Sequence, residues 1–176
     1  MIVTVTGGSG SGKSEFAENL MTELLNKTSE NNKLFYIATM KPYGEEAAKR
    51  IQRHQKLREG KGFKTIECYK NIGNCKLDSK SNVLLECMSN LAANEMFDSI
   101  MQDKYCVYQK ICSGIDILKD KTSNFVIVTN DIFSDGVIYD NSTMEYIELL
   151  GMVNQYLAKI SDRMVEVIYS CPFEII

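Results

Sequence analysis

The residues with the clearest chemical signal form a glycine-rich loop near the start of the chain. They are Gly7, Gly8, Ser9, Gly10, Ser11, Gly12, Lys13 and Ser14. The segment fits the phosphate-loop pattern G-x-x-x-x-G-K-[ST] in full, and Lys13 stands where a Rossmann fingerprint would need its third glycine. Glycines let backbone N–H groups point into one concavity, and the following helix N-terminus adds partial positive charge. The loop predicts binding of a nucleoside triphosphate, with Lys13 at the β- and γ-phosphates and the Ser14 hydroxyl on Mg²⁺.

A second candidate site surrounds the single histidine of the chain, His54. Three of the four arginines lie within four residues of it: Arg50, Arg53 and Arg58. On a helix, Ala47 and Ile51 share a face with His54, so the imidazole turns toward the protein body. Guanidinium groups bind phosphate, and a neutral imidazole can attack phosphorus and hold a nucleotidyl group covalently. A histidine satisfied on a solvated basic helix is the alternative, and the spacing alone leaves both open.

Acidic residues stand at or just after the ends of predicted strands. Glu86 ends an apolar strand, where a carboxylate facing the phosphate loop serves as a Mg²⁺ ligand, directly or through water. Glu67 ends a shorter strand and could accept hydrogen bonds from ribose hydroxyls or a purine N–H. Asp131 and Asp135 follow another strand and could sense metal or act as a base, although loops are rich in Asp. We therefore place the metal on Ser14 and Glu86.

These residues are held by strands that alternate with helices. The runs that predict strands are 1–6, 33–38, 63–67, 82–86, 125–129 and 164–169, with 173–176 as a further candidate. The runs that predict helices extend from 15 to about 27–29 and over 45–59, 89–101, 105–119 and 143–160. Such alternation implies right-handed crossovers and a mainly parallel sheet covered on both faces. We predict one α/β domain over 1–176 of the RecA-like P-loop NTPase class, with the ligand at the carboxyl edge of the sheet.

Composition excludes several other classes of protein. The 176 residues carry a net charge of −3, which gives no electrostatic case for nucleic acid. No apolar run approaches the ~20 residues of a membrane span, and the first strand leaves no room for a signal peptide. Six cysteines without a C-x-x-C pair, beside one histidine, do not form a metal site. We expect a cytoplasmic protein with reduced thiols.

Motifs spread over nearly the whole chain match one known family. They are Thr6 to Ser14, Tyr36 to Thr39, Glu46, Arg50 and Ile51, His54 and Arg58, Thr65 with Glu67 and Cys68, Leu84 to Cys87, Asn94 and Phe97, Val128 to Asn130, and Gly151 to Ala158. With these residues the sequence resembles the bifunctional adenosylcobinamide kinase/adenosylcobinamide-phosphate guanylyltransferases of cobalamin assembly.

The resemblance implies a homotrimer that binds GTP, ATP and Mg²⁺. The resemblance also implies two reactions. An enzyme of this family first phosphorylates adenosylcobinamide with a nucleoside triphosphate, and it then transfers GMP from GTP to adenosylcobinamide phosphate through a guanylyl-histidine. The family's nucleophile falls on His54, and we expect Lys13 and Arg58 to neutralise the charge that develops. The guanine-nucleotide contacts fall on the phosphate loop and on Ala38, Thr39, Met40, Gln55, Lys56, Leu57, Arg58, Glu67 and Glu86.

The chain departs from the family at positions outside the nucleotide motifs. Phe63 stands where the family usually has Trp. After Asn130 the usual Glu, glycine-rich turn and Pro are replaced by residues 131–139, and 143–148 lack the usual arginine. The Phe63 change is mild, whereas the changes after Asn130 bear on the expected corrinoid contacts and on whether the chain keeps both activities. Two other functions therefore stay open: a small-molecule kinase without a covalent histidine, and a GTP-binding regulatory protein that has lost its corrinoid.

Overall fold

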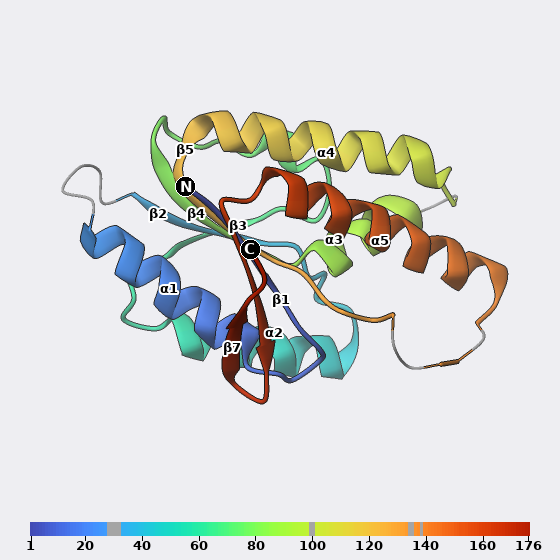
Figure 1. The fold of residues 1–176 in the computed structure, drawn as a ribbon, viewed down its shortest axis with the longest axis horizontal. Helices are drawn as coiled ribbons and strands as arrows, with labels where there is room; N and C mark the ends of the chain where they lie inside the picture. The colour runs from blue at the N-terminus through green and yellow to red at the C-terminus, as the bar shows by residue number, and fades with distance from the viewer. Residues whose placement is uncertain (28–32, 99–100, 134–135, 138) are drawn as a thin grey trace.

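The computed structural model describes residues 1–27, 33–98, 101–133, 136–137 and 139–176. Its strands form one seven-stranded sheet in the order β3-β2-β4-β5-β1-β6-β7 (Figure 1). They are β1 (Ile2–Thr6), β2 (Leu34–Ala38), β3 (Lys64–Glu67), β4 (Ser81–Glu86), β5 (Thr122–Val128), β6 (Arg163–Ile168) and β7 (Cys171–Glu174). Neighbouring strands are parallel except β6 and β7, which are antiparallel. The predicted α/β fold of the RecA-like P-loop class, with a mainly parallel sheet, is confirmed.

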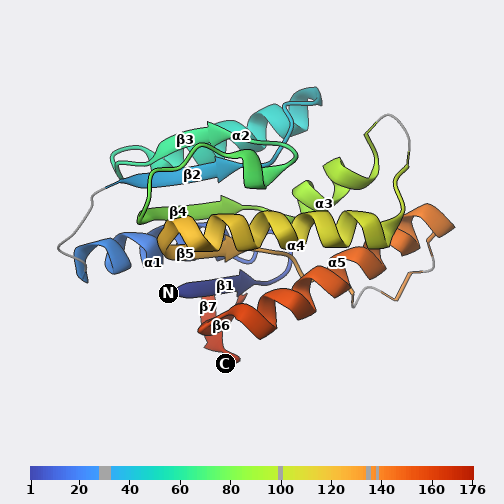
Figure 2. The same ribbon diagram turned by 90° about the horizontal axis from the view of Figure 1, so that it is seen from above.

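Helices cover both faces of the sheet (Figures 1 and 2). They are α1 (Lys13–Lys27), α2 (Gly44–Arg58), α3 (Met88–Met96), α4 (Lys104–Lys121) and α5 (Asn141–Ile160), with a short 3₁₀ turn, η1 (Ile72–Asn74), that the sequence did not predict. Helices α1 and α2 lie on one face, and α3, α4 and α5 lie on the other. The last two residues of the predicted first helix, 28 and 29, lie outside the described residues.

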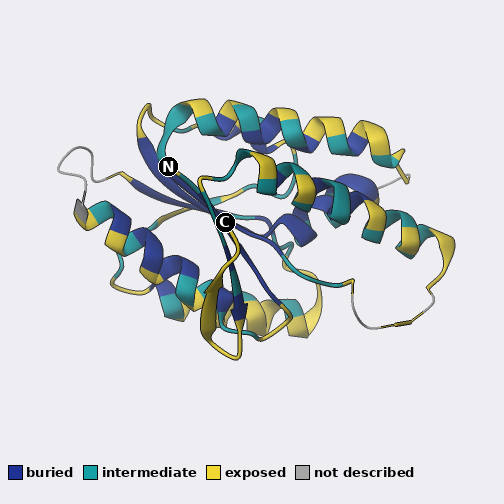
Figure 3. Ribbon diagram, viewed as in Figure 1, coloured by how far each residue is buried: buried dark blue, intermediate teal, exposed yellow. Residues whose placement is uncertain are grey.

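One hydrophobic core lies on each face of the sheet, because successive side chains of a strand point to opposite faces. In β4, Leu84 packs in the core that contains Ala17 and Met21 of α1. Its neighbours Val83 and Leu85 pack instead in the core beneath α3, α4 and α5. Both sides of the central strands are therefore buried (Figure 3), which explains why β4 and β5 appear in the sequence as continuous apolar runs. Among the described residues, no helix combines the length and apolarity needed to cross a membrane.

The helix predicted over 89–101 is wrong at its C-terminal end, because α3 stops at Met96. Apolar residues at Phe97 and Met101 continue the helical pattern, but both side chains are 42% exposed and leave the core. Asp103 then begins the next helix, since its side chain accepts hydrogen bonds from the backbone N–H groups of Tyr105 and Cys106. The helix predicted over 105–119 therefore begins after this N-cap, as α4 (Lys104–Lys121).

The hairpin formed by β6 and β7 supports the phosphate loop. Its turn places two non-glycine residues, Tyr169 and Ser170, at φ values of 48° and 64°. The Ser170 backbone N–H donates to the Ser11 carbonyl over 2.8 Å. A Cβ on Gly12, which has φ +94°, would lie 2.6 Å from Ser170 Oγ. The close approach of the hairpin, together with this backbone conformation, explains why position 12 requires a glycine.

Candidate nucleotide-binding and transfer site

The phosphate loop joins the end of β1 to α1, whose first residue is Lys13. Lys13 is buried, and its Nζ donates to the Gly8 carbonyl over 2.7 Å. Burial lowers the pKa of Lys13, while nearby Cys87 and Glu86 raise it. The ammonium group therefore lies inside the loop, close to the end of β4, where it can reach the phosphates of a bound nucleotide.

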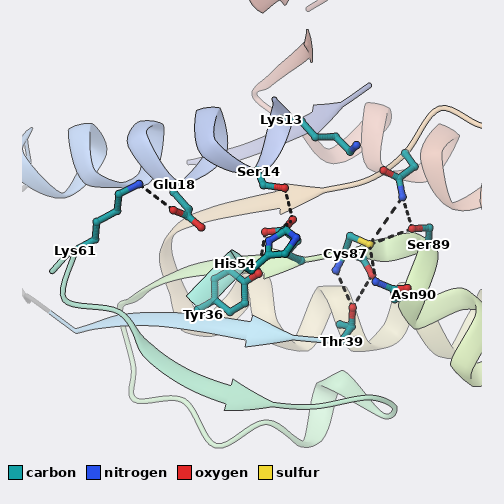
Figure 4. Close-up of polar contacts among 12 residues, drawn as sticks. Lys13, Ser14, Glu18, Tyr36, Thr39, His54, Lys61, Cys87, Ser89 and Asn90 are labelled. Carbon is teal, nitrogen blue, oxygen red and sulfur yellow. Dashed lines mark hydrogen bonds and ion pairs between the residues drawn. The ribbon is translucent and has the colours of Figure 1, made fainter. Parts of the chain in front are cut away.

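Glu86 connects the phosphate loop to the neighbouring elements through three side chains, Ser14, Tyr36 and His54, which lie close together in Figure 4. It ends β4 and is buried, with Oε1 accepting from the Ser14 hydroxyl and Oε2 accepting from Tyr36 over 2.9 Å. His54 Nδ1 lies 3.3 Å from Glu86 Oε1. Burial would raise the pKa of Glu86, but His54, Ser14 and Tyr36 together hold it below its usual value. The structure thus brings an ionised carboxylate, a loop hydroxyl and the only imidazole to one point.

Helix α2 carries His54 on its inward face. Its outer face is exposed, whereas Ala47, Ile51 and His54 are partly buried and Arg58 is buried (Figure 3). This burial confirms the predicted inward face of the helix. The His54 side chain is 22% exposed, and its approach to Glu86 is close without hydrogen-bond alignment, so Nδ1 has no hydrogen-bond partner among the described residues.

Arg58 lies at the end of α2, with its guanidinium carbon 3.6 Å from the centre of the Tyr36 ring. This is cation–π stacking, and Nη1 of Arg58 has no hydrogen-bond partner among the described residues. Phe63 packs edge-on against the same Tyr36 ring at 6.1 Å, so it keeps an aromatic contact where the family usually has Trp. The guanidinium is thus positioned by stacking and keeps a donor for an anion.

A buried ion pair ties the loop after α2 to α1. Lys61 Nζ lies 2.9 Å from Oε2 of Glu18, whose side chain is 0% exposed. Burial raises the pKa of Glu18, whereas Lys61 and, more weakly, Arg58 lower it. Because Glu18 lies on the same helix as Lys13 and Ser14, this pair holds the end of α2 close to the phosphate loop (Figure 4).

Two adjoining cavities gather most of the predicted site residues. A cleft of about 280 Å³ runs between the phosphate loop, α2 and the ends of β4 and β5. The residues predicted from the sequence that line this cleft are Ser9 to Ser14, Met40, His54, Leu57 and Glu86. A smaller, more apolar cavity of about 110 Å³ shares His54 and Glu86 with the cleft and adds Ala38, Gln55, Arg58 and Glu67. The two cavities could hold the triphosphate and the nucleoside, respectively.

Some predicted residues lie outside these cavities. Lys56 lies on the exposed outer face of α2. Thr39 is buried and exchanges hydrogen bonds with the backbone of Cys87, so it supports the wall of the site. The Asp131 carboxylate accepts from the Phe133 backbone N–H and so stabilises its own loop. Asp135 lies outside the described residues.

Sequence reasoning assigned no role to a group of neutral polar residues that also line the cleft. They are Cys87, Ser89, Asn90 and Asn130. Each follows the carboxyl end of β4 or β5, the edge where ligands of parallel sheets bind. That position in the sequence was the available signal, although it gives no information on the contacts among the four side chains.

The residues present fit Mg²⁺ as an ion that arrives with the nucleotide. Ser14 and Glu86 offer two hard oxygen ligands beside the phosphate loop. Within the described ranges, no group of three or more His, Cys, Asp or Glu residues is arranged to hold a metal. Mg²⁺ suits such a site because it keeps several waters and is bound by one or two side chains plus substrate phosphates.

The phosphate loop, the basic helix and the buried carboxylate around one cleft define a P-loop nucleotide-binding protein with a histidine in its site. The chain belongs to the cobinamide kinase / cobinamide phosphate guanyltransferase family, whose profile matches residues 3–175. It is 29% identical to the bifunctional adenosylcobalamin biosynthesis protein CobU of Salmonella typhimurium, covering 93% of each chain. Its identity to the CobU protein of Escherichia coli is 27%, covering 90% of each chain.

Solved structures give weaker matches. The flagellar accessory protein FlaH of Methanocaldococcus jannaschii is 11% identical with a TM-score of 0.47, covering 94% of this chain and 70% of FlaH. A solved ATPase domain is 7% identical with a TM-score of 0.49, covering 94% of this chain and 68% of that chain. The fold assignment therefore rests on the sheet order and the phosphate loop.

Proposed function

We propose that this chain, as one domain, carries both activities of its family. It phosphorylates adenosylcobinamide with a nucleoside triphosphate and then transfers GMP from GTP to adenosylcobinamide phosphate. Family membership over residues 3–175 supports the two activities. The observation that supports a covalent histidine is the 3.3 Å approach of His54 Nδ1 to Glu86 Oε1, because the same carboxylate oxygen accepts from Ser14 of the phosphate loop.

In the guanylyl step, His54 attacks the α-phosphorus of GTP. Its Nδ1 edge faces Glu86, so Nε2 on the opposite edge carries the lone pair that forms the N–P bond. The bond from the α-phosphorus to the bridging oxygen breaks, and pyrophosphate leaves. The adjacent ionised carboxylate stabilises the positive charge that the ring gains. An oxygen of the corrinoid phosphate then attacks the same phosphorus, the N–P bond breaks, and neutral His54 is restored.

Cationic groups from two helices neutralise the charge on the phosphates. Lys13 lies within the loop and holds the β- and γ-phosphates. The stacked Arg58, whose Nη1 has no hydrogen-bond partner among the described residues, neutralises charge at the phosphate under attack. Mg²⁺ held by Ser14 and Glu86 would supply further charge neutralisation when bound with the nucleotide. We further propose that the enzyme is a cytoplasmic homotrimer, and sedimentation would check the oligomeric state. We also propose that it uses ATP or GTP in the kinase step, and competition between the two nucleotides would check this choice.

Labelling with GTP that carries a radioactive α-phosphate tests the proposal. We expect the wild-type chain with Mg²⁺ to acquire an acid-labile label, and the His54→Ala variant to acquire none. Lys49→Ala, on the exposed outer face of the same helix, is the matched control and keeps the label. An unlabelled wild-type chain that still phosphorylates cobinamide would indicate a kinase without a covalent histidine. Equal labelling of His54→Ala would refute His54 as the nucleophile.

A further inference from the structure

The cleft has a third wall besides the phosphate loop and α2. We call Ser89, Asn90 and Asn130 the polar wall; all three line the cleft and surround the thiol of Cys87. Asn90 Nδ2 donates to Cys87 Sγ over 3.2 Å, and Ser89 Oγ lies 3.0 Å from the same sulfur. Asn130 Nδ2 donates to Ser89 Oγ and lies 3.9 Å from Cys87 Sγ. The labelled members of this group cluster next to His54 below Lys13 (Figure 4).

The polar wall is anchored to the body of the protein on the face opposite α2. Asn154 of α5 donates from Nδ2 to the Asn130 carbonyl over 3.2 Å, and its Oδ1 accepts from Thr129 over 2.6 Å. Tyr146, also of α5, donates to the Ser89 carbonyl over 3.2 Å. These contacts hold the backbone of Ser89 and Asn130 without help from the helix that carries His54, and the hydrogen bonds around Cys87 then orient the side chains. The wall is therefore a preorganised part of the cleft.

The hydrogen bonds within the wall determine what it can offer a ligand. The Nδ2 groups of both asparagines donate to other members of the group, to sulfur or to the serine hydroxyl, which leaves their Oδ1 atoms available as acceptors. The wall carries no charged side chain. A neutral acceptor oxygen suits the O–H of an alcohol, whereas an anionic phosphate needs cations such as Arg50 and Arg53 on the α2 side.

We propose that the polar wall is the subsite that binds and orients the alcohol acceptor in the kinase step, an inference that rests on the proposed function. The Oδ1 atoms of Asn90 and Asn130 accept the alcohol O–H, so that an oxygen lone pair faces the γ-phosphate beside Lys13. The alcohol oxygen forms a bond to the γ-phosphorus, the bridging P–O bond breaks, and nucleoside diphosphate leaves. The alcohol proton passes to an oxygen of the transferred phosphoryl group and then to solvent.

This assignment divides the two reactions between opposite sides of one cleft. The imidazole reaches the nucleotide from α2, on the face that also carries α1. The alcohol reaches it from the ends of β4 and β5, next to α3 and α5. Phosphoryl transfer needs mainly positioning and charge neutralisation, so a neutral orienting group is sufficient for the acceptor.

Steady-state kinetics with cobinamide as the acceptor test the subsite. We expect Asn90→Ala and Asn130→Ala each to lower kcat/KM for cobinamide by about tenfold or more. Asn130 lines only the larger cleft, so Asn130→Ala should change KM for the nucleotide by less than about twofold and keep the wild-type rate of His54 labelling by α-labelled GTP without corrinoid, which shows that the variant is folded. Asn74→Ala, an exposed amide outside the cleft, is the matched control and changes neither reaction.

Two results would overturn the subsite. If both variants keep the wild-type kcat/KM for cobinamide, the polar wall does not bind the acceptor. Loss of His54 labelling in parallel with kinase activity, in variants that unfold at the wild-type temperature, assigns the wall to the nucleotide instead. Failure of the proposed function differs from both, because the wild-type chain itself would then phosphorylate no cobinamide, and the subsite would be refuted with it.

Discussion

The buried pair of Glu18 and Lys61 leads to a prediction that combines stability and pH. Glu18 is 0% exposed, and its Oε1 has no hydrogen-bond partner among the described residues, so Lys61 is its principal compensating charge. Removing one partner of a buried pair costs roughly 3–5 kcal/mol. We expect Lys61→Met to lie at the low end, about 3 kcal/mol, because the Lys61 side chain is 25% exposed and Arg58 still favours the carboxylate.

The cost of Lys61→Met depends on pH in a defined direction. Burial raises the folded-state pKa of Glu18 above its unfolded value, and loss of Lys61 raises that pKa further. A carboxyl with a raised folded pKa contributes stability at low pH that disappears as pH rises through the folded pKa. The variant should therefore be most destabilised near neutral pH and approach the wild type as Glu18 becomes protonated in acid.

Thermal and urea unfolding between acid and neutral pH measure this effect. A loss of about 3 kcal/mol in a chain of this size lowers the unfolding midpoint by roughly 6–12 °C. Lys56→Met, on the exposed outer face of α2, is the control and should change stability by less than about 0.5 kcal/mol. The reasoning would be refuted if Lys61→Met also changed stability by less than about 0.5 kcal/mol at neutral pH. It would also be refuted if the loss of stability were the same at every pH.

Three further predictions concern the site. Gly12→Ala should abolish GTP binding in a titration and lower the unfolding temperature, because its Cβ would meet Ser170 at 2.6 Å. Tyr36→Phe removes the donor to Glu86 Oε2 but keeps the ring under Arg58, so denaturant unfolding should show a loss of about 1–2 kcal/mol. Chelation of Mg²⁺ should stop His54 labelling yet leave the unfolding temperature of the free protein unchanged, since the described residues hold no metal cluster; a large drop would reveal a structural metal.

Local sequence rules predicted the parts of the site that depend on neighbouring residues. The pattern from Gly7 to Ser14 gave the loop, and the helical spacing of Ala47, Ile51 and His54 gave the inward face of α2. The strand that ends at Glu86 was also predicted, because a buried parallel strand is apolar throughout. These features are properties of short segments, so one sequence is enough to predict them.

Contacts between distant segments could not be predicted in the same way. Glu86 receives Ser14, Tyr36 and His54 from three different elements, and only the folded sheet shows that they share one carboxylate. The support that Ser170 gives to the phosphate loop joins residues almost a whole chain length apart. The end of α3 at Met96 likewise depends on which apolar residues reach the core, which helical periodicity alone does not reveal.

Two side chains of the phosphate loop are already hydrogen-bonded before a nucleotide binds, which affects the thermodynamics of binding. Lys13 donates to the Gly8 carbonyl and Ser14 donates to Glu86. A triphosphate that engages these groups exchanges one set of strong bonds for another, so little net heat is gained from them. Its affinity then depends on the backbone N–H groups of the loop and on attraction to the surrounding cations, and dissolved ions screen that attraction. Binding of GTP should therefore weaken steeply as the ionic strength of the buffer increases.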